Sequence, residues 1–326
     1  MVVICMNDKK DRMKLKIRLK EKRVMYEKRT DLAIEVKESF PQDGIEIDGV
    51  ALKKADVDGL EITTVEIRNE QGAFQMKKPI GSYITIEMTE QESSILDREN
   101  GFVRQLSFVL EQMLKKTIGE KQSVFALLSG LGNRFATPDA LGAYVLEKVS
   151  MNRHIKKEFI GVVPSDKVTI CGLAPGVMSQ TGMESSEILK GIIDKVQPDV
   201  LLVVDALASS SVNRLCRTIQ ITNTGISPGA GIGNNRNRID QETMGIPVIA
   251  IGVPTVVDAG TIIYESLEHA LAKEGYQEKE IYQFFQSVIE NKWKDLFVTP
   301  KEIDEEVRQM SDIIAQGITA FVEGRK

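Results

Sequence analysis

The chain has 326 residues, 42% of them hydrophobic, and a net charge of −5 at neutral pH, which are ordinary values for a globular protein. No apolar stretch approaches the ~20 residues of a membrane-spanning helix, and the apolar opening is too short for a signal peptide, so we expect no membrane association and a cytoplasmic location. The three cysteines form no CxxC pair and the two histidines, His154 and His269, lie far apart, which argues against a disulfide framework and the usual zinc motifs.

The first 30 residues form a basic arm. They hold eleven Lys and Arg against four Asp and Glu, a net charge of about +7, so the remainder carries about −12. Such an arm can bind nucleic acid. It lacks the interleaved aromatic side chains on which bases stack, so a solvated, removable or docking extension is the favoured interpretation.

Beyond the arm, alternating polar and apolar residues predict a small β region within about 45–95. The segments LEITTVEIRN (60–69) and SYITIEM (82–88) are typical of strands with one solvated face, and the turn-rich segment 69–81 separates them. Residues 96–119 predict a helix, because their apolar residues recur at helical spacing up to a closing glycine.

From about residue 123 onward the pattern predicts an α/β domain with a mostly parallel sheet between helices. Three apolar runs without polar alternation are typical of strands buried on both faces of such a sheet. They are VFALLSG (124–130), DVLLVVDALA (199–208) and IPVIAIGVPTVVDAG (246–260). The chain closes with predicted helices within about 264–326.

Two helices of the α/β region have predicted start signals. Thr137 is expected at an N-cap with Pro138 after it, and Thr181 with Glu184 has the spacing of a capping box. The Gly- and Asn-rich segment 226–240 predicts a long loop, and loops of that length usually serve a function or are disordered.

Each apolar run ends close to an aspartate, namely Asp139, Asp205 or Asp258. Because ligands bind outside the carboxyl ends of strands in open α/β sheets, the three acids are candidates for acid/base catalysis. Asp139 can instead serve only the helix dipole, Asp205 can be a polar strand end, and Asp258 has no distinguishing neighbour. The pattern leaves these alternatives open.

If Asp139 and Asp205 lie close together, their surroundings favour different protonation states. A helix N-terminus favours an ionised Asp139, whereas an apolar strand favours a protonated Asp205. One carboxylate could then activate water while the other protonates a carbonyl oxygen. The nearby segment SGLGN (129–133) lacks the third glycine and the lysine of phosphate-binding loops, so a tight turn is the favoured interpretation.

Several long motifs closely resemble the germination proteases of endospore-forming bacteria. The resemblance runs from about Arg29 to Ala259 and resumes at 298–304. It is carried by RTDLAIEVKES (29–39), GLGNRFATPDALG (130–142), APGVMSQTGMESSEILKGI (174–192), DALASSSVNRLCRTIQITNTGISPGAGIGN (205–234) and IPVIAIGVPTVVDAGTI (246–262).

The resemblance implies an endopeptidase that degrades small acid-soluble spore proteins in the spore core during germination. It implies an atypical aspartic protease that needs no cofactor or metal, with an α/β fold similar to hydrogenase-maturation endopeptidases. The family's catalytic aspartates match Asp139 in TPDALG and Asp205 in VVDALA. It also implies a homotetramer, and it replaces the nucleic-acid interpretation of the basic arm.

The family matures from a zymogen by removing its own N-terminal segment, and it cleaves after Glu or Asp and before a hydrophobic residue followed by Ala. The resemblance therefore implies a propeptide over 1–31, cleavage between Asp31 and Leu32, and a single peptidase domain over 32–326.

An acidic preference requires a cationic or donor-rich pocket. Three arginines are candidates for it: Arg134, Arg236 and Arg238. A carboxylate-ligated metallopeptidase of related fold is the remaining alternative for the enzyme.

Overall fold

The structure is a computed structural model that describes residues 28–40, 47–88, 95–158, 168–233, 236–289, 293 and 296–324. Most of the predicted propeptide, residues 1–27, lies outside the described residues. The chain divides into two compact units, of which the larger comprises Thr30–Val257 and Val298–Lys326. The smaller comprises Met1–Arg29 and Asp258–Phe297.

The larger unit is built on one mixed sheet with the strand order β1-β2-β3-β7-β8-β6-β4-β5. Neighbours from β8 to β5 pair in parallel, and those from β1 to β8 pair antiparallel. The strands are β1 (Val50–Val57), β2 (Leu60–Ile67), β3 (Gly81–Met88), β4 (Val124–Gly130), β5 (Val168–Leu173), β6 (Val200–Ser209), β7 (Thr218–Thr222) and β8 (Val248–Asp258). The predicted α/β class is confirmed, and the predicted small β region continues the same sheet through β7.

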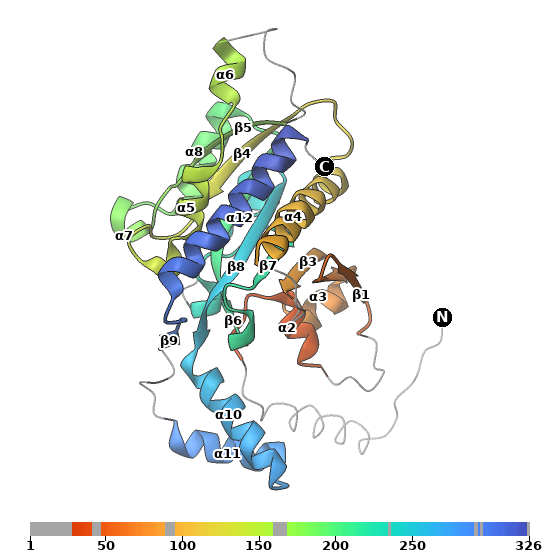
Figure 1. Ribbon diagram of the computed structural model, residues 1–326, viewed down its shortest axis with the longest axis vertical. Coiled ribbons are helices and arrows are strands. Elements are labelled where there is room, and N and C mark those ends of the chain that lie inside the picture. Colours follow the sequence, from red (N-terminus) through yellow and green to blue (C-terminus); the bar gives the residue numbers. More distant parts are fainter. Residues whose placement is uncertain are drawn as a thin grey trace, which may run out of the picture. The chain divides into compact units, whose positions relative to one another are not determined.

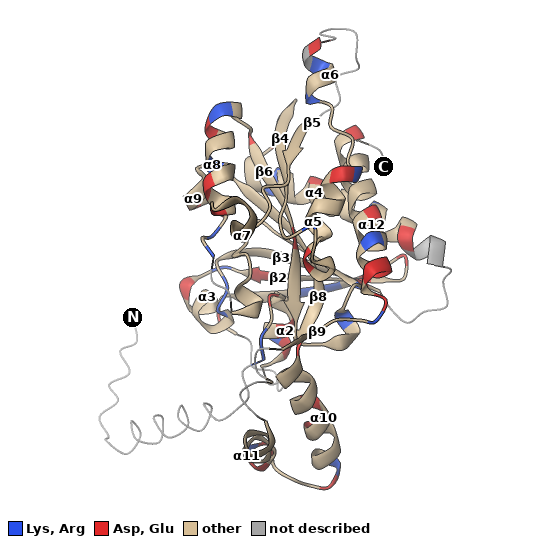
Figure 2. Cartoon of the chain, turned by 90° about the vertical axis from the view of Figure 1, so that its left-hand side faces the viewer, with Lys and Arg blue, Asp and Glu red and all other residues tan. Residues whose placement is uncertain are grey.

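Helices cover both faces of the parallel strands, as Figures 1 and 2 show. One face packs against α4 (Ile95–Ile118), α5 (Leu141–Lys148) and α12 (Ile303–Glu323). The other packs against α8 (Ser185–Val196) and the short α9 (Gln241–Met244). The shorter elements of this unit are α2 (Ala33–Glu38), α3 (Glu70–Met76), α6 (Arg153–Glu158), α7 (Met178–Thr181), η1 (Thr137–Asp139), η2 (Val212–Arg214) and η3 (Ala230–Ile232).

The residues of β6 alternate between the two helical layers. Val200, Leu202 and Val204 belong to the core cluster with α4, α5 and α12, whereas Leu201 and Val203 pack with α8. Because successive side chains of a strand point to opposite faces, Asp205 is the next residue on the α8 face. The all-apolar run of β6 therefore follows from burial on both faces, as predicted.

Two long helices match their sequence patterns. The predicted helix 96–119 is α4, whose apolar stripe is buried and which ends before Gly119 at a φ of 74°. The predicted closing helix is α12, whose buried stripe includes Val307, Met310 and Ile314. In both cases the 3.6-residue period of apolar residues fixed the buried face.

Three local predictions were wrong. The segment 69–81 contains the helix α3, because the Asn69 side chain accepts a hydrogen bond from the Gly72 N–H at 2.7 Å and caps its first turn. Thr137 is not an N-cap, because it is itself the first residue of the short helix η1. Likewise α8 begins after Glu184, whose N–H is bonded to the Glu187 carboxylate at 2.9 Å, so Thr181 ends α7 instead.

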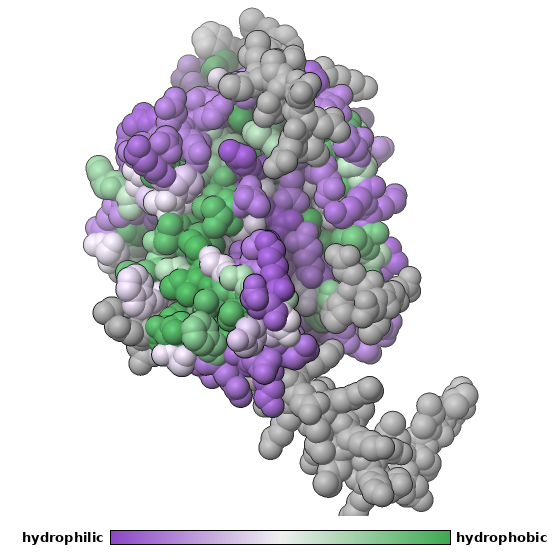
Figure 3. All heavy atoms as spheres, turned by 60° about the horizontal axis from the view of Figure 1, so that its bottom comes forward, coloured by the Kyte–Doolittle hydropathy of each residue, from purple (hydrophilic) through white to green (hydrophobic). Residues whose placement is uncertain are grey.

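The smaller unit contains α10 (Ala259–Lys273) and α11 (Glu278–Val288), followed by Phe297 at the start of β9 (Phe297–Val298). Tyr264 of α10 meets Phe285 of α11 edge to face, with ring centroids 5.4 Å apart. The face of the molecule drawn in Figure 3 exposes a group of apolar side chains, coloured green.

Among the described residues, no helix combines the length and apolar character that crossing a membrane requires.

Candidate active site

The carboxyl end of β6 projects beyond its neighbour β4. Pairing with β4 ends at Gly130 opposite Val204, and the Val204 carbonyl then accepts the Leu131 N–H at 2.8 Å. Pairing with β8 continues to Ser209 opposite Val257. Residues two apart on a strand direct their peptide groups to the same side, so Ala206 and Ala208 face the side that β4 has left. A segment of backbone can therefore bind along this edge.

Asp205 lies at the start of this projecting edge. Its side chain is 4% exposed, and one oxygen accepts the Ala206 N–H at 3.0 Å. Burial raises the pKa of Asp205 well above its usual value, and the nearby charges of Asp139 and Asp31 raise it further. The protonated form of this carboxyl is therefore favoured.

Asp139 reaches the same place from the connection between β4 and α5. Gly132, at a φ of 94°, lets this connection turn back, and an added Cβ there would lie 1.9 Å from the Asp139 carbonyl oxygen. The Asp139 carboxylate accepts the Asn133 N–H at 2.7 Å. Burial raises its pKa and this hydrogen bond lowers it. The segment SGLGN thus forms the tight turn that was expected.

The structure brings Asp139 and Asp205 together. The helix η1, which ends at Asp139, contacts β6, and the charge of Asp139 raises the pKa of Asp205. We expected the helix N-terminus to leave Asp139 freely ionised, but burial raises the pKa of both acids. Asp139 keeps partial exposure and a backbone donor, so it is the better carboxylate of the pair.

Asp258 serves as a structural cap in the smaller unit. Its carboxylate accepts the N–H and the hydroxyl of Thr261 at 3.1 and 3.0 Å, at the start of α10. This role satisfies the orphan donors of the first helical turn.

The predicted cleavage segment occupies the projecting edge of β6. The Asp31 N–H donates to the Ala208 carbonyl at 2.9 Å, and the Ala208 N–H donates to the Asp31 carboxylate at 2.9 Å. Leu32, which is fully buried, packs against Leu207 of the same strand. The Asp31–Leu32 bond therefore lies two to three residues along β6 from Asp205.

A buried glutamate fixes the chain that follows this bond. The Glu35 carboxylate accepts hydrogen bonds from the Ser209 hydroxyl at 2.5 Å and from the Ser210 N–H at 2.7 Å. Both serines follow Ala208 at the end of β6, so this carboxylate anchors α2 to the strand.

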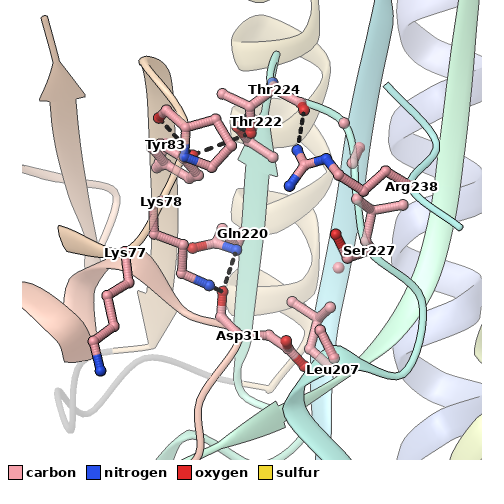
Figure 4. A pocket seen from close by; sticks show the side chains of 16 residues that line it. Asp31, Lys77, Lys78, Tyr83, Leu207, Gln220, Thr222, Thr224, Ser227 and Arg238 are labelled. Atoms are coloured by element: carbon pink, nitrogen blue, oxygen red, sulfur yellow. Dashed lines mark hydrogen bonds between the residues drawn. The ribbon is translucent and has the colours of Figure 1, made fainter. Parts of the chain in front are cut away.

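Lys78 and Gln220 hold the carbonyl of the same bond, as Figure 4 shows. The Lys78 ammonium donates to the Asp31 carbonyl oxygen at 2.9 Å, and the Gln220 amide donates to it at 3.3 Å. The Gln220 side-chain oxygen also accepts the Ala33 N–H at 2.7 Å. Lys78 precedes β3 and Gln220 lies on β7, so the sheet brings these groups to the bond from distant parts of the chain.

The three candidate arginines each have an acidic neighbour. Arg134 is paired with Glu147, Arg236 lies 3.5 Å from Glu184, and Arg238 is bonded to Asp240 at 2.7 Å. Arg238 also lines the pocket that contains Asp31 and Lys78 (Figure 4). Their assignment to substrate binding stays a prediction.

Within the described ranges, no group of three or more His, Cys, Asp or Glu side chains is arranged to hold a metal ion. No residue pattern assigned a role to Lys78, Gln220 or Glu35, and Gly132 was expected only as part of a tight turn. Glu35, Gln220 and Gly132 do lie within the segments that carry the family resemblance, whereas Lys78 lies outside them.

We predict that replacing Asp205 with Asn stabilises the folded chain at neutral pH. The folded-state pKa of Asp205 is raised above 3.8, so its contribution to stability is complete below that pH and is lost as the pH rises toward the folded-state pKa. Asn carries no charge that burial would penalise, so we expect a higher free energy of unfolding for the variant at about pH 7.

Denaturant unfolding of both proteins between about pH 4 and pH 8 measures this difference. The gain should shrink toward the acidic end, where the unfolded wild-type chain begins to retain the proton that folded Asp205 keeps. A difference that does not change with pH would contradict the buried, proton-retaining carboxyl.

Comparisons with known proteins agree on one family. The family model described as germination protease matches residues 27–280. The chain is 42% identical to the germination protease of Clostridium perfringens (strain 13 / Type A), over 92% of this chain and 96% of that protein. It is 40% identical to that of Clostridium tetani, over 90% and 95%.

Among solved structures, the chain is similar to a [NiFe] hydrogenase maturation protease, HycI, from Thermococcus kodakarensis, with a TM-score of 0.32 and 18% identity. The match covers 64% of this chain and 98% of that one. The family match spans most of the chain, including both strand-end aspartates of the larger unit and the Asp31–Leu32 segment. The chain therefore belongs to the germination protease family.

Proposed function

We propose that this protease is a self-processing zymogen that begins the degradation of small acid-soluble spore proteins in the germinating spore core. Asp139 and Asp205 are its catalytic pair, and it cleaves after Glu or Asp and before a hydrophobic residue followed by Ala. The first cut is its own, between Asp31 and Leu32. On this proposal the working form is a homotetramer that needs no cofactor.

One observation carries the proposal. Asp31, which precedes the proposed scissile bond, is hydrogen-bonded to Ala208, three residues after Asp205 on the same strand, and its charge raises the pKa of Asp205. Asp139 acts on Asp205 in the same way. The bond to be cut, the general acid and the general base thus gather at the carboxyl end of one strand, where α/β folds bind their ligands.

The pair supplies complementary proton transfers. Asp139 takes a proton from water as the water oxygen bonds to the Asp31 carbonyl carbon, and Asp205 gives its proton to the carbonyl oxygen. The resulting diol collapses when Asp139 passes its proton to the Leu32 nitrogen, the carbon–nitrogen bond breaks, and a diol proton returns to Asp205. No acyl-enzyme forms, and both carboxyls end in their starting states.

Self-processing is expected to require both acids. We predict that the purified full chain, incubated at mildly acidic pH, acquires a new N-terminus at Leu32. Asp139→Asn and Asp205→Asn should each slow this by at least about 1,000-fold, because each removes one proton carrier from a coupled pair. Intact-mass spectrometry over time measures the conversion.

Asp258→Asn is the matched control. It makes the same substitution at another buried strand-end aspartate, and Asn keeps the helix cap, so this variant should process at the wild-type rate. Processing by either dyad variant at that rate would refute the mechanism. Loss of wild-type processing on addition of a chelator would instead favour the metallopeptidase alternative.

The glycine turn before η1 offers a second test of the catalytic geometry. We predict that Gly132→Ala lowers processing by about 100-fold, since the new Cβ would lie 1.9 Å from the Asp139 carbonyl oxygen and the turn must shift. Mass spectrometry measures the rate, and circular dichroism confirms that the variant is folded.

Gly191→Ala provides the matched comparison. Gly191 lies within α8, and an added Cβ there meets no atom within 4 Å. This variant should process normally and gain up to about 1 kcal/mol in stability from helix propensity. Equal processing by the Gly132 and Gly191 variants would show that the turn does not position Asp139.

A further inference from the structure

We propose that the projecting edge of β6, with Lys78 and the N–H groups of Ala208 and Gly231, is the subsite for the acidic residue before the scissile bond. Lys78 is its specificity-determining residue. This inference rests on the proposed function, and it assigns the pocket that reads the substrate. Asp31 occupies that pocket as the corresponding residue of a substrate would.

The carboxylate of Asp31 is bound mainly by backbone donors. The Ala208 N–H donates to it at 2.9 Å, and the Gly231 N–H lies close enough to lower the pKa of Asp31. An added Cβ at Gly231 would lie 2.2 Å from the carboxylate oxygen, so the glycine leaves the space that the carboxylate fills. Backbone N–H groups can donate to a carboxylate and, more weakly, to a neutral amide oxygen, so they do not by themselves require a charged residue.

Lys78 supplies the positive charge that distinguishes an acidic residue from a neutral one at this position. Its ammonium donates to the Asp31 carbonyl oxygen at 2.9 Å, and although the residue is partly exposed, the ammonium itself is buried. Burial lowers the pKa of Lys78, whereas the charge of Asp31, followed by that of Glu35, raises it. Glu35 already accepts hydrogen bonds from Ser209 and Ser210, so Asp31 is the carboxylate that the substrate itself brings.

The two residues after Asp31 are bound in matching ways. Leu32 is fully buried and packs against Leu207 and Ile34, as a hydrophobic residue after the bond requires. Ala33 is also fully buried, it packs in a cluster with Tyr83, and its N–H is bonded to Gln220 at 2.7 Å. A larger side chain than Ala would have to displace that cluster. All three positions of the proposed cleavage sequence therefore sit in sites that fit them.

Lys78 fits this role better than the arginines. Arg238 lines the same pocket, but its guanidinium is bonded to Asp240 at 2.7 Å and to the Thr224 carbonyl at 3.4 Å. Removing one partner of a buried charge pair leaves the other uncompensated. A neutral residue in place of Asp31 would remove the larger of the two negative charges that stabilise the Lys78 ammonium.

A double-mutant cycle on self-processing tests the assignment. The rates are measured by mass spectrometry for the full wild-type chain, Asp31→Asn, Lys78→Met and the double variant. We expect Asp31→Asn to slow processing by at least about tenfold in the wild-type background. In the Lys78→Met background the same change should alter the rate less than about threefold. Arg238→Gln is carried through an identical cycle as the matched cation.

The outcomes separate the possibilities. An equal effect of Asp31→Asn with and without Lys78 would overturn the assignment, as would coupling of Asp31 to Arg238 in place of Lys78. A uniform slowing by Lys78→Met, with no coupling, would show that Lys78 serves only the carbonyl oxygen. Failure of the wild-type chain to process, or processing by the Asp139 and Asp205 variants, would count against the proposed function itself.

A second comparison does not depend on how Lys78→Met folds. Asp31→Glu and Asp31→Gln have the same shape and differ only in charge, and both are made in the chain with Lys78 intact. The Glu variant should process within about threefold of wild type, and the Gln variant about tenfold more slowly than the Glu variant. Equal rates for the two would refute a charge-reading subsite.

Discussion

The unequal lengths of the two pairings of β6 are the constraint on which the site depends. On one side of β6, pairing with β4 ends at Val204. On the other side, pairing with β8 continues to Ser209, so the end of β6 offers free peptide groups on the β4 side to a further segment of chain. Asp31 takes up both hydrogen-bonding groups of Ala208 there. The same ending of β4 starts the turn that carries Asp139 back over the sheet edge. One shortened strand thus creates the binding edge and positions one of its acids.

Burial of three carboxyls around this edge costs stability, and the fold offsets only part of that cost. Asp31 gains the Ala208 N–H and the nearby charge of Lys78, and Asp139 gains the Asn133 N–H. Asp205 gains only its neighbour's N–H and is pushed toward its protonated form by two adjacent charges. This imbalance is typical of catalytic sites, because a general acid must keep its proton at the pH at which it works.

The sequence pattern predicted the elements whose signal is repeated over many residues. The long apolar stripes of α4 and α12 and the run of β6 identified their elements, because burial repeats at every turn or residue. Single-residue signals failed at Thr137 and Thr181, because the N-cap residues are Ala136 and Glu184, one and three residues away. Residue pattern alone did not separate Asp139 from Asp258. The resemblance separated them, and the structure brings only Asp139 and Asp205 of the predicted acids together within the larger unit.

Lys78 and Gln220 show why the rest of the site could not be predicted. Lys78 follows a helix that the sequence did not indicate, and it lies 47 residues from the carbonyl that it binds. Gln220 is a polar residue in a buried strand, 189 residues from the same carbonyl. Their roles arise only when β3 and β7 pair beside the end of β6, and that pairing depends on tertiary contacts. Arg134 was a candidate because it lies five residues before Asp139, and Arg236 and Arg238 were candidates because they lie in the Gly- and Asn-rich segment 226–240.

The position of the proposed acidic subsite gives an acidic preference a chemical use. The charge of Asp31 raises the pKa of Asp205, so a bound acidic residue helps the general acid to retain its proton. A neutral residue would lose both the charge attraction to Lys78 and this effect on the pKa of Asp205. Once the bond is cut and the acidic product leaves, the pKa of Asp205 falls and the carboxyl becomes easier to ionise. On this proposal the residue that the enzyme recognises also keeps Asp205 protonated for the donation to the carbonyl oxygen.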